Sequence, residues 1–125
     1  IPRKNQRTGK LCIKHSDGNL WDILDLIVDA GPDAINPLEP VAGMDIRRVK
    51  EAYGDRVCLV GNIDCGELLS HGTRGQVDAA VCHCLAAASP GGGFILSSSN
   101  SIHSSVNPDN YLAMVEAGHA YGLYE

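Results

Sequence analysis

The sequence has no long apolar run, no excess of positive charge and no apolar leader at its start. None of its apolar segments approaches the roughly 20 residues that a membrane-spanning helix needs. The first residues, IPRKNQRTGK, lack the apolar centre of a secretory signal, so we expect a cytoplasmic protein. The net charge of −5 gives no general attraction to nucleic acid or to an anionic membrane, and we expect neither as a partner.

The cysteine spacing excludes the common metal and redox motifs. None of the five cysteines forms a C-x-x-C pair. Cys82-His83-Cys84 has metal-ligating residue types, but it falls in a helical run. Side chains two positions apart on a helix point about 200° away from each other. We therefore expect two structural thiols in a helix, in the reduced state typical of a cytoplasm.

Short apolar segments alternate with segments of helical periodicity along the chain. The predicted strands cover residues 11–14, 34–36, 57–60 and 93–96, and the predicted helices cover 20–30, 45–53, 73–88 and 108–120. This alternation predicts an α/β fold with a parallel sheet. No G-x-G-x-x-G follows the first strand, which argues against a dinucleotide-binding fold.

The spacing of the strands predicts part of a barrel. The strands begin roughly 20 to 40 residues apart, close to the ~30 residues of one unit in a (β/α)₈ barrel, and about four units are half of such a barrel. The chain also begins without methionine, in what resembles a helix-to-strand linker. We therefore expect residues 1–125 to be a partial barrel domain and a fragment of a longer protein.

Polar side chains follow every predicted strand at its carboxyl end. In barrels and open α/β sheets alike, ligands bind at that end of the strands. The pattern therefore predicts one site to which all the strand ends contribute. Its candidate residues are His15, Ser16, Asp17, Asn36, Glu39, Asn62, Asp64, Ser97, Ser98, Ser99, Asn100 and His103.

Each candidate also has a structural alternative. Asp17 or Asn19 can cap the helix that follows, and Asp64 can hold a turn. The serines of residues 97–99 can satisfy backbone groups. His71, His83 and His119 lie on or beside predicted helices, where we expect surface or packing residues. Trp21 and Tyr111 lie at helix starts, where we expect packing, with a place at the mouth of the site as the alternative.

Two histidines are the candidate catalytic residues. His15 at a strand end can be a metal ligand, a proton donor, or a hydrogen-bond donor to a substrate carboxylate, and His103 is the second candidate. Asp17 and Glu39 can orient His15 or join it as ligands of a divalent metal, the only cofactor considered. The candidate substrate-binding residues are Asp17, Asn36, Glu39, Asn62, Asp64, Ser98 and Asn100.

A series of motifs resembles the C-terminal half of the uroporphyrinogen decarboxylase superfamily. That superfamily includes cobalamin-dependent methyltransferases that act on methylated corrinoid proteins. The resemblance runs over nearly all of residues 11–120 and implies the last four units of a (β/α)₈ barrel whose N-terminal half is missing. In order, the motifs are HSDGN, AINPLEP, GMD, GDRVCLVGNID, the GT before a helix, GGGFILSSSNSIH and VNPDNYLAM.

In the methyltransferase branch, the resemblance implies a zinc held by a His-x-Cys after the fifth strand and a Cys after the eighth. His15 falls on the histidine and Asp17 on the first cysteine, while residues 97–100 contain no cysteine. The thiolates that suit zinc in thiol activation are therefore absent, and a harder metal on His15, Asp17 and Glu39 is the alternative.

In the decarboxylase branch, the resemblance implies a tetrapyrrole substrate with acetate side chains. The key aspartate and arginines of that branch come from the missing N-terminal half. The last strand's loop supplies a histidine, for which His103 is the candidate at an offset of several residues.

Three functions follow as expectations. The first is decarboxylation of a tetrapyrrole in porphyrin biosynthesis, or a related reaction, by the intact enzyme, with this fragment inactive alone. The second is corrinoid-dependent methyl transfer, with a corrinoid-linked substrate. The third is an inactive half-barrel that only binds such a ligand, or a remnant. A half-barrel has two open sheet edges, so dimerisation or aggregation is also expected if it folds alone.

Overall fold

The computed structural model describes residues 8–123 and forms one parallel sheet with strand order β1-β2-β3-β4. This confirms the predicted α/β fold with strands paired in chain order. No helix in the described part of the chain is long and apolar enough to cross a membrane. The strands are β1 (Ile13–Ser16), β2 (Ala34–Pro37), β3 (Cys58–Ile63) and β4 (Phe94–Ser98).

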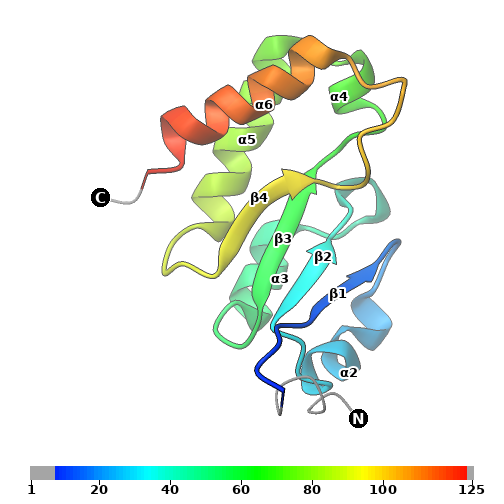
Figure 1. The fold of residues 1–125 in the computed structure, drawn as a ribbon, viewed down its shortest axis with the longest axis vertical. Helices are drawn as coiled ribbons and strands as arrows, with labels where there is room; N and C mark the ends of the chain where they lie inside the picture. The colour runs from blue at the N-terminus through cyan, green and yellow to red at the C-terminus, as the bar shows by residue number, and fades with distance from the viewer. Residues whose placement is uncertain (1–7, 124–125) are drawn as a thin grey trace.

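The helices connect the strands and cover one face of the sheet. Figure 1 shows α2, α3 and α5 behind the strands, while α6 runs beside α5 at the β4 side. The strand ends point to the same edge, where the longer loops lie. The helical segments are η1 (Trp21–Ile23), α2 (Leu24–Asp29), η2 (Pro40–Ala42), α3 (Ile46–Tyr53), α4 (Leu68–His71), α5 (Arg74–Ala88) and α6 (Pro108–Tyr121).

Local sequence signals explain where the longer helices begin. The Asp45 side chain accepts a hydrogen bond from the Arg48 N–H at 2.9 Å and caps α3. Thr73 and Gln76 form a reciprocal capping box at the start of α5. Pro108 opens α6, where its missing N–H costs no helical hydrogen bond.

The first unit differs from the prediction. β1 begins two residues later than expected, because its register pairs Ile13 with Ala34 and places His15 opposite Asn36 inside the ladder. The predicted helix over 20–30 is a 3₁₀ turn followed by the short α2. The four-residue α4 has no counterpart in the prediction, because so short a helix gives no periodic signal.

The hydrophobic core lies between the sheet and its helices. Each ladder partner pair in a parallel sheet points to the same face, so Ile35 and Leu59 turn together towards the helices. No helix within residues 8–123 covers the opposite face, and Ile13 and Ile95 on the outer strands remain exposed. Fully buried side chains of the core are Leu24, Ile35, Met44, Val49, Leu59, Ile63, Leu69, Val77 and Val81.

Gly61 marks a close approach between β3 and the end of β2. Its φ is 152°, and a Cβ atom at this position would overlap the carbonyl oxygen of Pro37. A side chain therefore cannot be added without moving backbone that supports the sheet edge. By contrast, Gly75 in α5 has open space where its Cβ would lie.

We expect Gly61→Ala to lower the free energy of unfolding by about 1–3 kcal/mol, because the methyl group overpacks the strand junction. Gly75→Ala is the matched control and should leave stability unchanged or raise it by up to about 1 kcal/mol. Urea unfolding followed by circular dichroism measures both. Equal midpoints for the two variants would contradict the close approach.

Candidate functional site

Four polar side chains from three strand ends form a continuous series of contacts at the carboxyl edge of the sheet. His15 Nδ1 lies 2.6 Å from Asn36 Oδ1, and His15 Nε2 lies 3.2 Å from Asp17 Oδ1. Asn100, in the loop after β4, donates from Nδ2 to the same Asp17 oxygen at 3.2 Å. We call Asn36, His15, Asp17 and Asn100 the rim network.

The Asp17–Asn100 contact joins loops that follow opposite edges of the sheet. β1 and β4 are the outer strands, and the two residues are 83 positions apart in the sequence. Their loops can meet only if the carboxyl edge of the sheet is curved. The predicted convergence of strand ends is therefore real for three of the four strands.

His15 is held by acceptors on both sides of its ring. Asn36 donates from Nδ2 to the Val60 carbonyl at 3.4 Å, which turns its Oδ1 towards His15. The second ring nitrogen faces the Asp17 carboxylate. Its side chain is 52% exposed, so a ligand at the rim can reach it.

Glu39 holds the loop after β1 and does not contact His15. Its Oε2 accepts a hydrogen bond from the Gly18 N–H at 2.7 Å. Beside it, Asn19 donates to the Ala42 carbonyl and accepts from the Trp21 N–H, so Asn19 and not Asp17 stabilises the start of the first helical segment. Glu39 thus fixes the loop that carries Asp17.

The predicted metal set of His15, Asp17 and Glu39 is not assembled. Among residues 8–123, no three His, Cys, Asp or Glu side chains are grouped so that they could hold a metal ion. The physical reason is that the Glu39 carboxylate is turned to the Gly18 backbone, so Asp17 alone of the two carboxylates reaches the His15 ring.

Asn62 in β3 and Asp64 in the loop after it both hold neighbouring backbone in place through hydrogen bonds. Asn62 donates from Nδ2 to the carbonyl oxygens of Leu38 and Met44, at 2.5 and 3.1 Å, and so anchors the loop between β2 and α3. Asp64 accepts from the N–H groups of the three residues 66–68. Asp64 therefore holds a turn, which is its structural alternative to binding a ligand, because both of its carboxylate oxygens already accept hydrogen bonds.

The loop after β4 brings Asn100 to the rim network but not His103. Ser98 donates from Oγ to the Asn100 carbonyl at 2.7 Å and shapes this loop. Nδ1 of His103 accepts from the Ser105 N–H at 3.3 Å. In the described part of the chain, no hydrogen bond or ion pair joins His103 to His15, so of the two predicted catalytic histidines only His15 is linked to the rim network by a direct contact.

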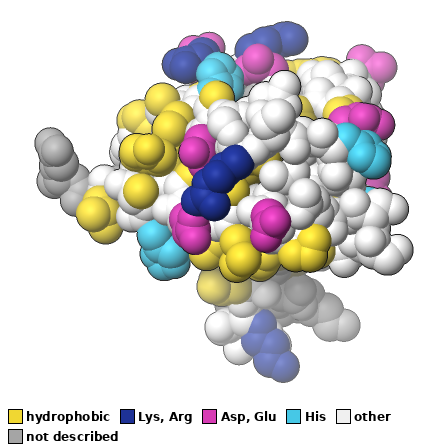
Figure 2. Space-filling model, turned by 90° about the horizontal axis from the view of Figure 1, so that it is seen from above, with side chains coloured by type: hydrophobic (Ala, Val, Ile, Leu, Met, Phe, Trp, Pro, Cys, Tyr) yellow, Lys and Arg dark blue, Asp and Glu magenta, His cyan; other side chains and the backbone are white. Residues whose placement is uncertain are grey.

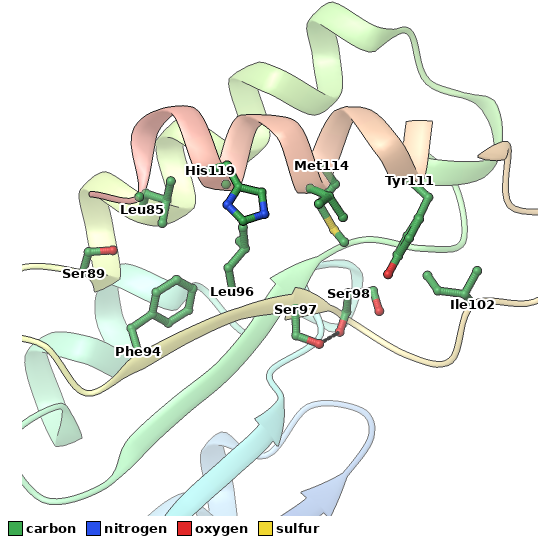
Figure 3. Close-up of a pocket in the computed structure, with 13 residues that line it drawn as sticks. Leu85, Ser89, Phe94, Leu96, Ser97, Ser98, Ile102, Tyr111, Met114 and His119 are labelled. Atoms are coloured by element: carbon green, nitrogen blue, oxygen red, sulfur yellow. Dashed lines mark hydrogen bonds between the residues drawn. The ribbon is translucent and has the colours of Figure 1, made fainter. Parts of the chain in front are cut away.

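A cavity of about 460 Å³ lies between α6 and β4, and the prediction did not include it. Figure 3 shows Tyr111 and His119 of α6 above Phe94, Leu96 and Ser98 of β4. The sequence predicts a surface or packing role for His119, and a packing role or a place at the mouth of the site for Tyr111. Their spacing of eight positions places them along one side of a helix, which is the signal that could have found them.

The Cys82-His83-Cys84 segment lies on α5 and splits between surface and core. Cys82 and His83 are exposed, while Cys84 is buried and its Sγ lies 4.0 Å from Asn62 Oδ1. Burial raises the pKa of the Cys84 thiol to about 11. The thiols of Cys82 and Cys84 therefore point in different directions from α5, which agrees with the structural role expected of both residues.

Because of that raised pKa, we expect Cys84 to resist alkylation at pH 9 in the folded protein, at least about tenfold more than Cys82. Mass spectrometry of iodoacetamide-treated protein measures the two sites separately. In urea the two thiols should react alike, which is the control. Equal rates in the folded protein would contradict the burial of Cys84.

We expect Asp64→Ala to lower the free energy of unfolding by about 1–3 kcal/mol, because three backbone N–H groups lose their acceptor. Glu51→Ala, on the exposed side of α3, is the control and should change stability by less than about 0.5 kcal/mol. Urea unfolding measures both. A loss of unfolding free energy no larger than that of the control would mean that Asp64 does not stabilise the turn, and Asp64 would again be a candidate substrate-binding residue.

Comparison with solved structures agrees with a partial barrel. The chain resembles a methyltransferase from Methanosarcina mazei with a TM-score of 0.78 and 24% sequence identity. The likeness covers 91% of this chain and 32% of the methyltransferase chain. At this identity it shows the fold alone.

Curated relatives are uroporphyrinogen decarboxylases. One from Psychromonas ingrahamii is 33% identical over 107 residues, which are 86% of this chain and 28% of that protein. One from Nitrosospira multiformis is 35% identical over 103 residues, covering 82% and 26%, and one from Thioalkalivibrio sulfidiphilus is 29% identical over 110 residues, covering 85% and 28%. The chain thus spans little more than a quarter of the length of these relatives.

The sequence also matches the family model for uroporphyrinogen decarboxylase (URO-D) over residues 2–121. This match takes in the rim network and all the strands and helices described above. The chain therefore belongs to the uroporphyrinogen decarboxylase family.

Proposed function

We propose that this chain supplies the C-terminal half of the active-site rim in an enzyme that decarboxylates a tetrapyrrole. Its family membership and its curated relatives support the reaction class. The observation that carries the proposal is the rim network, which holds an accessible imidazole where ligands bind in parallel α/β folds. The remainder of the rim would come from the other half of a barrel.

The chemistry asks for a proton donor beside the substrate. When an acetate side chain of a pyrrole loses carbon dioxide, the C–C bond breaks and its electron pair passes to the CH₂ carbon or into the ring. A proton must then reach that carbon to leave a methyl group. His15 is the group assigned to this proton, with the Asp17 carboxylate stabilising the imidazolium before transfer.

Asp17, Asn36 and Asn100 are positioning residues in this proposal. Asn36 fixes one face of the His15 ring through Nδ1, and Asp17 aligns the other nitrogen. Asn100 holds Asp17 from the loop across the rim. The four residues of the rim network offer oxygen acceptors and include no cysteine, and this favours decarboxylation over zinc-dependent methyl transfer, for which thiolates are the suitable ligands.

A chimaera tests the role of His15. The matching 103 residues of the Nitrosospira multiformis decarboxylase would be replaced by the aligned part of this chain, and uroporphyrinogen decarboxylation measured. We expect His15→Ala to lower kcat by about 10²–10⁴-fold, because a positioned proton donor contributes that much. Asp17→Asn should lower kcat less than His15→Ala does, because the ring keeps a hydrogen-bond partner at Nε2 but loses the anionic one.

His83→Ala is the matched control, since His83 is exposed on α5 away from the rim. It should keep the activity of the parent chimaera. If His15→Ala has no more effect than His83→Ala while the parent is active, the proposed role of His15 is wrong. An active enzyme with only a raised KM would assign His15 to binding the substrate carboxylate instead.

A further inference from the structure

The segment between β2 and α3, residues 38–44, holds the loop that carries Asp17. We call residues 38–44 the supporting segment. Each of the four residues that follow Asp17 donates one hydrogen bond to it, at distances from 2.7 to 3.3 Å. The donors are Gly18, Asn19, Leu20 and Trp21, and their acceptors are Glu39, Ala42, Met44 and Gly43 in that order. The place of Asp17 at the rim therefore follows the place of the supporting segment.

The supporting segment is itself fastened to β3. Asn62 donates from Nδ2 to the carbonyl oxygens of Leu38 and Met44, which are the two ends of the segment. β3 is paired on both sides, to β2 and to β4, so its backbone is held within the sheet. The loop with Asp17 is thus tied through two sets of hydrogen bonds to an inner strand, and not to β1 alone.

Glu39 supplies the contact that lies nearest to Asp17. Its carboxylate accepts from the N–H of Gly18, the very next residue, while the other three acceptors are backbone carbonyls and the Met44 sulfur. Gly18 has a φ of 83°, which glycine adopts without strain. Figure 2 looks down on the side towards which the strands run and shows acidic side chains lying open at the surface. Glu39, by contrast, is half-buried.

The partner of Glu39 is an uncharged donor, and this separates a positioning role from a charge role. A backbone N–H needs an acceptor but not a negative charge, so the amide oxygen of a glutamine can take the place of the carboxylate oxygen. A metal ligand or a proton-transfer group would need the carboxylate itself. Among residues 8–123, Glu39 forms no ion pair that would call for its charge.

We propose that Glu39 is a positioning residue of the rim, which acts on His15 through Gly18 and Asp17. The inference rests on the proposed function and adds a residue to it. By holding Gly18, Glu39 keeps Asp17 Oδ1 at 3.2 Å from His15 Nε2. Without that acceptor the turn after Asp17 shifts and the His15 ring loses its alignment. The proton transfer is then slowed more than substrate binding is weakened.

The chimaera with the Nitrosospira multiformis decarboxylase tests this role. Glu39→Ala should lower kcat by about 10–10²-fold, with KM changed by less than about threefold, because a small misplacement of a reacting group costs that much. Glu39→Gln should keep kcat within about threefold of the parent, because only the charge assistance of the hydrogen bond is lost. Glu51→Ala, exposed on α3, is the matched control and should equal the parent.

Glu39→Gln as inactive as Glu39→Ala would overturn the proposal, because the carboxylate itself would then be required. A double variant separates positioning from general loss of stability. Glu39→Ala added to Asp17→Ala should lower kcat by no more than about twofold further, since residues that act through one another are not additive. Losses that multiply would also overturn the proposal.

NMR of the imidazole nitrogens in this chain tests the same inference without the reaction. The His15 signals are those missing from His15→Ala. We expect Glu39→Ala to shift them, while Glu39→Gln and Glu51→Ala leave them in place. Unmoved His15 signals in Glu39→Ala would overturn the inference. Shifted signals together with full activity of the His15→Ala chimaera would support the positioning of His15 by Glu39 and overturn the proposed function.

Discussion

The parallel pairing of the strands in chain order is the constraint on which the rest of this structure depends. Because every strand runs in the same direction, every carboxyl end lies at one edge, and side chains that are far apart in the sequence meet there. The register between β1 and β2 then decides which side chains are neighbours. It places His15 directly opposite Asn36, and the 2.6 Å contact between them follows from that alignment.

The same pairing explains why polar residues of one type have different roles. Asp17 and Asp64 both follow a strand, and nothing in their residue type separates them. The carboxylate of Asp64 is surrounded by backbone N–H groups of the turn that leads to α4, so its acceptor capacity is used locally. Asp17 receives only side-chain donors and ring contacts from His15 and Asn100, and it is 54% exposed. The Asp64 carboxylate is therefore saturated by its own turn, whereas the Asp17 carboxylate is open to solvent at the rim.

Helices of residues 8–123 cover one face of the sheet and leave the other face uncovered. Helices cover the face that carries Ile35 and Leu59, and those side chains are buried. Ile13 and Ile95 lie on the outer strands and remain exposed, as the interior residues of an unclosed barrel would be. The chain's share of about a third of the methyltransferase chain and about a quarter of the decarboxylases agrees with this geometry.

The sequence by itself determined the alternation of strands and helices, the parallel sheet and the polar character of the strand ends. These depend on local periodicity and on caps such as Asp45 and Thr73, which act within a few residues. Only the tertiary structure decided that Asn100 reaches Asp17, that Glu39 turns to Gly18 and that His103 accepts from Ser105 within its own loop. Those contacts depend on sheet curvature and loop paths, which are set by packing among distant residues and leave no local pattern in the chain.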